Sequence, residues 1–366
     1  MMKSSHREPL FRIVKKDNAT LLSSVTVMAL AILAALLVNA VFIYFVTRLD
    51  PVSVYTSMFK GAFGSSRRTW ITIRDTCLLL LISVSLSPAF RMRFWNCGAE
   101  GQILIGGLST AALMIYCGDK IPTGILLLLM AVVSLLCGGL WAYLPACFKA
   151  KYDTNETLFT LMMNYVAIQL IEFFVDFWDK KQSHSVGIIN MNTQAGWFGS
   201  FLGQQYGLNI LIVMIVTIFV YVYMRYSKHG YEAAVVGESV ATARYAGINV
   251  PKVIRSNVFL SGAIAGLAGF VEVSGISHTI SKQTAGGRGF TAIIVCWLAK
   301  FNPLAMIFFS LLIVFLNKGA SQISSDFGLN EFASNIVIGI ILFFILSSDF
   351  FNNYRIVLSH KKKGDE

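Results

Sequence analysis

The sequence predicts an all-α polytopic membrane protein with about ten transmembrane helices. Of its 366 residues, 55% are hydrophobic and only 13% are Asp, Glu, Lys or Arg, about half the charged share that is usual in soluble domains. The apolar residues form long unbroken runs. Because roughly 20 such residues cross a bilayer as a helix, whereas the strands of a membrane barrel alternate over short segments, these runs indicate helices.

Ten apolar runs give the expected crossings in order along the chain. They lie at about 21–46, 70–90, 98–117, 122–147, 156–178, 207–226, 257–276, 287–300, 303–320 and 332–350. The first run is too long for the core of a signal peptide and follows a basic tail, so we expect an uncleaved span. Between the first two runs, residues 51–69 carry Phe59 and Phe63, which predicts an interfacial segment.

The distribution of positive charge predicts the orientation of the chain. The sequence holds 30 Lys and Arg against 19 Asp and Glu, and most of the cations fall in segments that are cytoplasmic if the amino terminus is inside. We therefore expect basic cytoplasmic tails at 1–20 and 351–366 around a single transmembrane domain at 21–350. Its longest inner loop is expected at 227–256 and its longest outer loop at 179–206.

Several functional classes find no support in the residues. The sequence contains no G-x-x-x-x-G-K-[ST] phosphate loop, no G-x-S-x-G and no H-E-x-x-H, so it offers no ATPase motif and no catalytic constellation. Its six Cys form no C-x-x-C and its five His are scattered singly, which argues against a metal site. No basic stripe is interleaved with aromatic residues on a soluble face, which argues against a nucleic-acid polymer as partner. We therefore expect no enzyme, no metal and no cofactor in this chain.

Polar side chains within the expected spans are candidates for a substrate pathway. They are Asn96, Glu100 and Gln102 at the start of the third run, Asn164 and Gln169 in the fifth, and Glu272 in the seventh. Such groups are costly at membrane depth and mark pathways or helix contacts. Each can equally act as interhelical glue, worth about 0.6 to 2 kcal/mol, and the residues alone leave both interpretations open. Proton relay through Glu100 or Glu272 would instead indicate an ion-coupled secondary transporter.

Two stretches indicate backbone that departs from a plain span or packs closely. The polar, Gly-rich sequence from Ser277 to Phe290 cannot face lipid, so it either lines a cavity or lies outside the membrane. In the seventh run, small side chains recur at helical spacing at Ser261, Gly262, Ala265, Gly266 and Gly269. This pattern predicts close helix packing and says nothing about substrate.

The expected inner loop contains a candidate docking helix. Residues 240–246 favour a short helix of small residues that ends at Gly247, with Pro251 soon after. Small side chains let another protein approach closely, and Arg244 and Tyr245 are of the types common at interface hot spots. A plain connector is the alternative.

Five stretches in this order resemble the membrane-spanning permease of bacterial ABC importers of the nucleoside and simple-sugar group. They are NCGAEGQILIGG (96–107), NETLFTLMMNYVA (155–167), GESVATARYAGINV (237–250), LSGAIAGLAGFVEVSG (260–275) and GFTAIIVCWLAKFNPLA (289–305). The sequence is most similar to the nucleoside-type permeases, from about residue 50 to residue 345. The resemblance implies a type II-like importer architecture with broken or re-entrant segments, in the bacterial cytoplasmic membrane.

The resemblance also implies roles for individual residues. The family element N-x-G-A-E-G-Q matches residues 96–102, and it implies that Asn96 and Gln102 contact substrate while Glu100, in the first turn of its helix, organises the site. The full set of expected pathway residues is Asn96, Glu100, Gln102, Asn164, Glu272, Phe290 and Trp297. Phe290 and Trp297 either stack on a nucleobase or pack against lipid and helices.

The inner loop matches the coupling helix that docks on the ATPase of these importers. The expected coupling residues are Gly237, Val240, Ala243, Arg244, Tyr245, Ala246 and Gly247. Relatives commonly have Asn-Pro where this chain has Ser239 and Val240. This departure leaves undecided which side chain caps the helix. A second departure, Ala299 in place of a usual Gly, predicts tighter packing near 290–302.

The resemblance finally implies the partners of the chain. A separate ATPase subunit would bind ATP and Mg, a second permease subunit, similar or identical, would complete the pore, and an external lipoprotein would deliver the solute. The expected solute is a nucleoside, with a simple sugar as the alternative. Side-chain amides suit a neutral solute of this kind, because they donate and accept hydrogen bonds at once.

Overall fold

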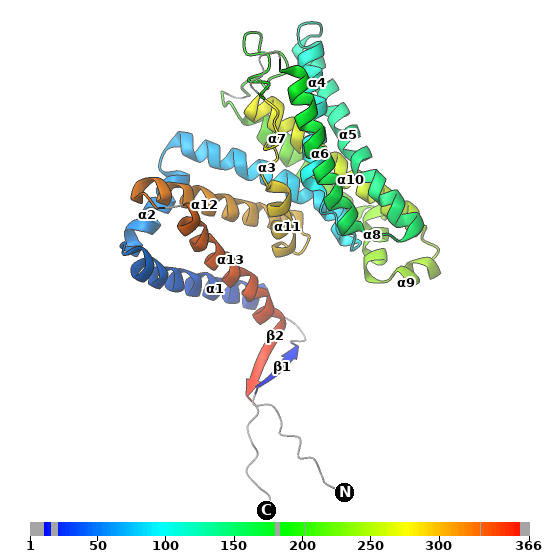
Figure 1. The fold of residues 1–366 in the computed structure, drawn as a ribbon. Helices are drawn as coiled ribbons and strands as arrows, with labels where there is room; N and C mark the ends of the chain where they lie inside the picture. Colours follow the sequence, from blue (N-terminus) through cyan, green and yellow to red (C-terminus); the bar gives the residue numbers. More distant parts are fainter. Residues whose placement is uncertain (1–10, 16–20, 180–183, 202, 330, 359–366) are drawn as a thin grey trace, which may run out of the picture. The chain divides into compact units, whose positions relative to one another are not determined.

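The computed structural model describes residues 11–15, 21–179, 184–201, 203–329 and 331–358, and helices make up most of this part (Figure 1). Within it, nine helices are long and apolar enough to cross a membrane. The prediction of an all-α polytopic membrane protein is therefore confirmed. The chain forms two compact units, one from residues 66–314 and one that combines the segments up to Ser65 and from Phe315 onward.

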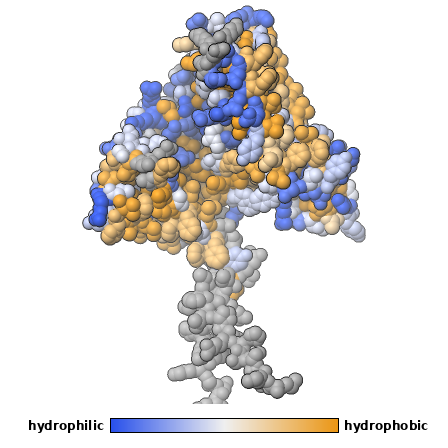
Figure 2. All heavy atoms as spheres, viewed as in Figure 1, coloured by the Kyte–Doolittle hydropathy of each residue, from blue (hydrophilic) through white to orange (hydrophobic). Residues whose placement is uncertain are grey.

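The unit of residues 66–314 holds most of the helices. In chain order they are α3 (Ser66–Arg91), α4 (Ala99–Cys117), α5 (Thr123–Tyr152), α6 (Glu156–Trp178), α7 (Gly207–Tyr226), α8 (Lys228–Glu238), α9 (Val240–Tyr245), α10 (Val250–Glu272), the π-helix η2 (Val273–Ser277) and α11 (Arg288–Leu298). The first part of α12 (Pro303–Phe327) also belongs to this unit. In Figure 2, apolar residues cover the sides of α4 to α6 and polar residues gather at the end that carries α8 and α9.

The other unit contains α1 (Leu21–Phe42), the π-helix η1 (Ile43–Thr47), α2 (Pro51–Phe63), the remainder of α12 and α13 (Glu331–Asn353). The predicted interfacial segment is the helix α2, which the Asp50 carboxylate caps by accepting from the Ser53 amide at 2.9 Å. Two short strands, β1 (Phe11–Lys15) and β2 (Tyr354–Leu358), pair antiparallel where basic tails are expected. The rest of those tails, at 1–10, 16–20 and 359–366, lies outside the described residues.

Helix α10 is the centre of the larger unit and packs on α3, α4 and α5. The small residues predicted to pack closely provide these contacts, because Gly266 lies against the backbone of both Gly138 in α5 and Gly106 in α4. A Cβ atom on Gly262 would meet the Gly138 carbonyl oxygen, and one on Gly269 would meet the Ile103 carbonyl oxygen. The prediction of a small-residue packing face is confirmed.

The broken segments lie where the polar, Gly-rich sequence indicates them. Helix α10 ends in the π-helix η2, irregular backbone follows, and the expected crossing at 287–300 is the helix α11 of only 11 residues. At about 1.5 Å rise per residue, α11 is too short to cross a bilayer alone. This explains why nine long apolar helices are found in the described part of the chain where ten crossings are expected.

Candidate functional site

The irregular segment before α4 is held by a reciprocal pair of side-chain amides. Asn96 donates to the Gln102 Oε1 at 3.2 Å, and Gln102 donates to the Asn96 Oδ1 at 2.9 Å. Asn96 also donates to the Ser261 hydroxyl in α10 at 3.0 Å. Both amides are buried. Either amide would have to give up these hydrogen bonds in order to contact substrate. In this structure the pair holds the irregular segment before α4 against α10.

Asn164 of α6 joins the same segment to α4. Its amide oxygen accepts from the Gly101 N–H at 2.9 Å, and its amide nitrogen donates to the Cys97 carbonyl at 2.9 Å. One turn earlier, the Thr160 hydroxyl accepts from the Cys97 N–H at 3.2 Å. Gly101 is required here, because a Cβ atom would lie 2.9 Å from the Asn164 oxygen. Gln169, on the same helix, is exposed and lies outside this cluster.

Glu100 connects α4 to the beginning of α11. Its carboxylate accepts from the Gly287 N–H at 2.7 Å and from the Gly289 N–H at 2.8 Å. Gly287 has a φ of 73°, the left-handed region that favours glycine, and a Cβ atom on Gly289 would lie 2.7 Å from the carboxylate. The two glycines thus allow a buried carboxylate to cap a helix that is remote in sequence.

Glu272 makes the second carboxylate contact with α11. It lies at the end of α10 and is 6% exposed, and the Arg288 guanidinium donates to it at 3.1 Å. Both carboxylates therefore bind the start of α11. Glu100 accepts from the backbone N–H groups of Gly287 and Gly289, and Glu272 binds the side chain of Arg288 between them. The pairing compensates the cost of a buried charge.

The two expected aromatic contacts, Phe290 and Trp297, lie on α11 and are 46% and 43% exposed. Trp297 stacks on Trp95 with ring centroids 5.2 Å apart and planes at 20°, and Phe301 meets its edge at 5.1 Å. Phe290 lies two turns away on the helix. The structure thus brings Trp297 to the broken segment before α4 and leaves Phe290 apart from that aromatic group.

The expected coupling residues form a short exposed helix with buried supports. Helix α9 begins after Ser239, whose hydroxyl accepts from the Thr242 N–H at 3.2 Å, so Ser239 supplies the cap where relatives commonly have Asn-Pro. Gly247 ends it with a φ of 75°, and the Ile248 N–H donates to the Ala243 carbonyl at 3.0 Å, as in a Schellman motif. Sequence reasoning placed both ends of this helix within one residue.

The exposure of α9 differs sharply between its faces. Ala243 is fully buried, whereas Tyr245 is 96% exposed; the side chains of Val240 and Arg244 and the residues Ala246 and Gly247 are also exposed. Gly237, at the end of α8, packs against the Arg91 carbonyl at the end of α3. A push on the exposed face of α9 can therefore reach α3 through α8.

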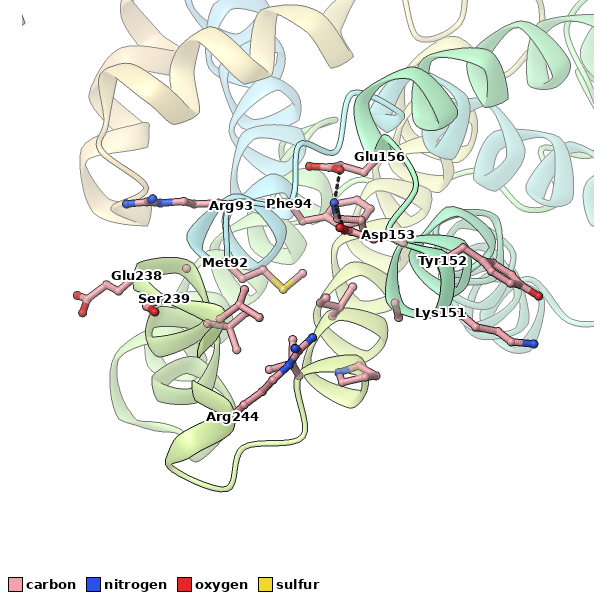
Figure 3. Close-up of a pocket in the computed structure, with 18 residues that line it drawn as sticks. Met92, Arg93, Phe94, Lys151, Tyr152, Asp153, Glu156, Glu238, Ser239 and Arg244 are labelled. Carbon is pink, nitrogen blue, oxygen red and sulfur yellow. Dashed lines mark ion pairs between the residues drawn. The ribbon is translucent and has the colours of Figure 1, made fainter. Parts of the chain in front are cut away.

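A pocket of about 750 Å³ lies between this helix pair and the turn from α5 to α6 (Figure 3). On its α5 side, the Lys149 ammonium contacts Asp153 at 2.7 Å and Glu156 at 3.1 Å, which ties the two helices together. The hydrogen bond from Lys149 lowers the pKa of the exposed Asp153 carboxyl below its ordinary value of 3.8. Arg244 of α9 lines the pocket from the opposite side.

Comparison with known proteins assigns the chain to a family. The model described as "Branched-chain amino acid transport system / permease component" matches residues 69–346. The chain belongs to this family of permeases. No solved structure matches it.

Curated relatives cover nearly the whole chain. The guanosine ABC transporter permease protein NupP of Bacillus subtilis is 29% identical over 94% of this chain and 98% of its own. The glucose ABC transporter permease protein TsgB13 of Haloferax volcanii is 26% identical over 92% and 91%, and the nucleoside ABC transporter permease protein NupB of Lactococcus lactis is 25% identical over 81% and 84%. The chain is thus an ABC importer permease of the nucleoside and sugar group, a transport subunit in the cell membrane that crosses it several times.

Several residues that hold the site were not among the sequence candidates. Thr160 lies in the stretch 155–167, but nothing in the sequence assigned it a role. Ser261 was expected only to pack against other helices. Gly287 and Gly289 were expected only to belong to a Gly-rich stretch of irregular backbone. The available signal for the glycines was their position just before an apolar run, where free N–H groups at a helix start attract a carboxylate. Their partner, Glu100, is far away in sequence, so no local pattern pairs them.

Proposed function

We propose that this chain is the membrane-spanning subunit of an ATP-driven importer that carries nucleosides into the cell. The observation that carries the proposal is the likeness to the guanosine permease of Bacillus subtilis over 98% of that protein, supported by the nucleoside permease of Lactococcus lactis. Import of a sugar is the second candidate, because the glucose permease of Haloferax volcanii covers the chain almost as fully.

The partners follow from this function. A separate ATPase subunit, which binds ATP and Mg, docks on the exposed face of α9 around Arg244 and Tyr245. A second permease subunit, similar or identical, completes the pore, and an external lipoprotein delivers the solute on the side opposite α9. Both termini then lie in the cytoplasm, in keeping with the basic residues around α8 and α9.

The site suits a neutral solute that forms hydrogen bonds. We assign Asn96, Gln102 and Asn164 to the substrate pathway, where their hydrogen bonds rearrange when the helix bundle switches between outward and inward openings. Helix α11 is the element that moves in this switch, and Glu100 and Glu272 hold its first residues. Phe290 and Trp297 present exposed aromatic faces on α11, which suits contact with a nucleobase.

The decisive experiment is uptake of radiolabelled guanosine, with glucose in a parallel arm, by membranes that contain the chain and its partner subunits. We expect guanosine uptake that requires ATP and is abolished in Arg244→Glu and Gly247→Arg, because the first reverses a charge on the docking face and the second forces a side chain into a left-handed backbone position. Uptake that survives both substitutions would contradict docking on α9. Uptake that persists without the ATPase and collapses with an ionophore would indicate an ion-coupled transporter instead.

A further inference from the structure

The turn from α5 to α6 lies across a pocket from the docking helix α9. Helix α5 ends at Tyr152 and α6 begins at Glu156, and both helices are candidate spans. The pocket of about 750 Å³ has Arg244 of α9 on one wall and residues of this turn on the other (Figure 3). A movement of α9 therefore changes what this turn faces.

One cation in the last turn of α5 holds two carboxylates that differ in exposure. The Lys149 ammonium contacts Asp153 at 2.7 Å and Glu156 at 3.1 Å. The Asp153 side chain is 88% exposed, whereas that of Glu156 is 13% exposed. An exposed carboxylate can change partners at little cost in free energy, but a largely buried one needs its cation. Glu156 is therefore the fixed partner of Lys149, and Asp153 is the partner that can leave.

Arg244 attracts the carboxylate that can leave. It lines the pocket from α9, and Asp153 lines it from the turn (Figure 3). The pKa of the Asp153 carboxyl is lowered chiefly by the hydrogen bond from Lys149, and the charge of Arg244 lowers it further. The attraction between Arg244 and Asp153 thus exists already in this structure, and it grows when the two side chains approach each other.

Glu156 connects Lys149 to the helix that holds the irregular segment before α4. Its main-chain carbonyl accepts from the Thr160 hydroxyl at 2.7 Å, and the same hydroxyl accepts from the Cys97 N–H at 3.2 Å. One turn later in α6, Asn164 donates to the Cys97 carbonyl at 2.9 Å. A shift of the first turn of α6 would therefore move the groups that hold this segment.

We propose that Lys149 is a positioning residue that carries the movement of the docking helix α9 to the substrate pathway. When α9 approaches the turn, Asp153 passes from Lys149 to Arg244. Lys149 then pairs with Glu156 alone and draws the first turn of α6 toward α5, and α6 moves the irregular segment before α4. The relay rests on the proposed function, because it requires an ATPase that moves α9. It is a second route beside the one through α8 and the end of α3.

A clamp that merely joins α5 to α6 is the alternative, and Asp153 separates the two. Asp153 follows α5 with a φ of 50°, a left-handed conformation that Asn also adopts. Asp153→Asn therefore keeps the turn and removes only the charge. A clamp depends on the pair of Lys149 with Glu156 and tolerates this change, whereas a relay through Asp153 does not.

The test reconstitutes the permease with its partner subunits in proteoliposomes. Uptake of radiolabelled guanosine, or of glucose if the wild type carries glucose, is measured together with ATP hydrolysis, and the quantity compared is uptake per ATP hydrolysed. Lys149→Gln should lower this ratio at least about fivefold, and Asp153→Asn should lower it about twofold, as for the loss of an exposed ion pair. Lys149→Arg should keep it, because a guanidinium can also bridge two carboxylates.

The matched control is Lys151→Gln, which removes the same charge from the same turn. The Lys151 ammonium lies over the Tyr152 ring, 5.0 Å from its centroid, so this variant leaves the contacts of Lys149 intact. We expect Lys151→Gln to keep the uptake per ATP of the wild type.

The outcomes separate the relay from the proposed function. A wild type without ATP-dependent uptake would contradict the proposed function and remove the basis of the relay. If the wild type transports, an equal uptake per ATP in Lys149→Gln and Lys151→Gln would overturn the relay alone. A parallel fall of uptake and hydrolysis in Lys149→Gln, with their ratio unchanged, would show a clamp and overturn it as well. If Lys149→Gln does not assemble, Asp153→Asn decides, and an unchanged ratio in that variant would refute the relay.

Discussion

The carboxylate of Glu100 accepts a 2.7 Å hydrogen bond from the N–H of Gly287, which lies 187 residues later in the chain. Its other oxygen accepts from Gly289 at 2.8 Å. The first N–H groups of an α-helix have no partner within the helix, and the positive end of the helix dipole favours a negative charge. One side chain of α4 therefore determines where α11 begins, and it connects the broken segment before α4 to the one after α10.

Glu100→Gln should loosen this connection. A neutral amide keeps one acceptor oxygen and brings an N–H₂ group toward two backbone donors, so at least one N–H loses a charge-assisted bond. We expect a loss of about 1.5 to 3 kcal/mol in the free energy of unfolding and a parallel loss of uptake, measured by thermal unfolding in nanodiscs and by transport. The exposed Asp119 offers a control, since Asp119→Asn should change stability by less than about 0.5 kcal/mol. Equal melting temperatures for Glu100→Gln and Asp119→Asn would show that the Glu100 contacts add no stability.

The close approach of α10 to α4 and α5 makes a second prediction at Gly266. A Cβ atom at this position would overlap the Ser134 carbonyl and the Gly138 backbone, neither of which can move without shifting a helix. Gly266→Ala should therefore destabilise the bundle by about 1 to 3 kcal/mol, the usual cost of overpacking. Gly124→Ala is the matched control, because nothing lies within 4 Å of a Cβ atom there. Thermal unfolding of both variants in the same nanodiscs checks this, and equal stability would contradict the packing.

Tyr245 allows docking to be separated from folding. Its side chain is 96% exposed, so Tyr245→Ala should leave the free energy of unfolding within about 0.5 kcal/mol of the wild type. If the ATPase docks on α9, loss of an aromatic anchor should weaken the complex by at least about 1 to 2 kcal/mol, roughly five- to thirtyfold in affinity. Co-purification of the ATPase measures this, with Tyr226→Ala as control, since Tyr226 is 71% exposed at the end of α7. Undiminished co-purification of Tyr245→Ala would show that this tyrosine is not an anchor.

Local sequence patterns predicted the long helices and both ends of α9, but not α8, because periodicity, small-residue spacing and caps act over a few residues. Gly247 has the left-handed backbone that its position after a short helix required, and Ser239 is a good cap on its own chemistry. The crossing expected at 287–300 was the exception. Helix α11 begins within one residue of the expected start, but its 11 residues are too few to cross a bilayer alone.

The interactions of the site could be predicted only in part. Sequence reasoning selected Asn96, Gln102 and Asn164 as polar groups in apolar surroundings, and it left open whether they serve substrate or packing. Their partners are one another, Ser261 and backbone groups of the break, and pairing of this kind depends on how α4, α6 and α10 meet. Periodicity in the sequence shows on which face of a helix a residue lies. It does not identify the atom of the neighbouring helix with which that residue forms a hydrogen bond.

The stack of His278 on Trp197 predicts a pH effect outside the spans. The two rings lie 3.8 Å apart with planes at 8°, and the segment around them is held by the bond of 2.8 Å from the Ile189 N–H to the His278 carbonyl. Desolvation lowers the pKa of His278 below its ordinary value of 6.5. The unfolded chain therefore binds a proton at a higher pH than the folded chain does.

The sign of the effect follows from that difference. Well above pH 6.5 the imidazole is neutral in both states and His278 adds no pH dependence. As the pH falls from 6.5 toward the lowered folded pKa, the unfolded state takes up the proton first, and the free energy of unfolding decreases. Thermal unfolding across this window should show the loss in the wild type and a smaller one in His278→Phe, which keeps a ring for Trp197 and cannot titrate. A slope unchanged in His278→Phe would assign the pH dependence to other groups.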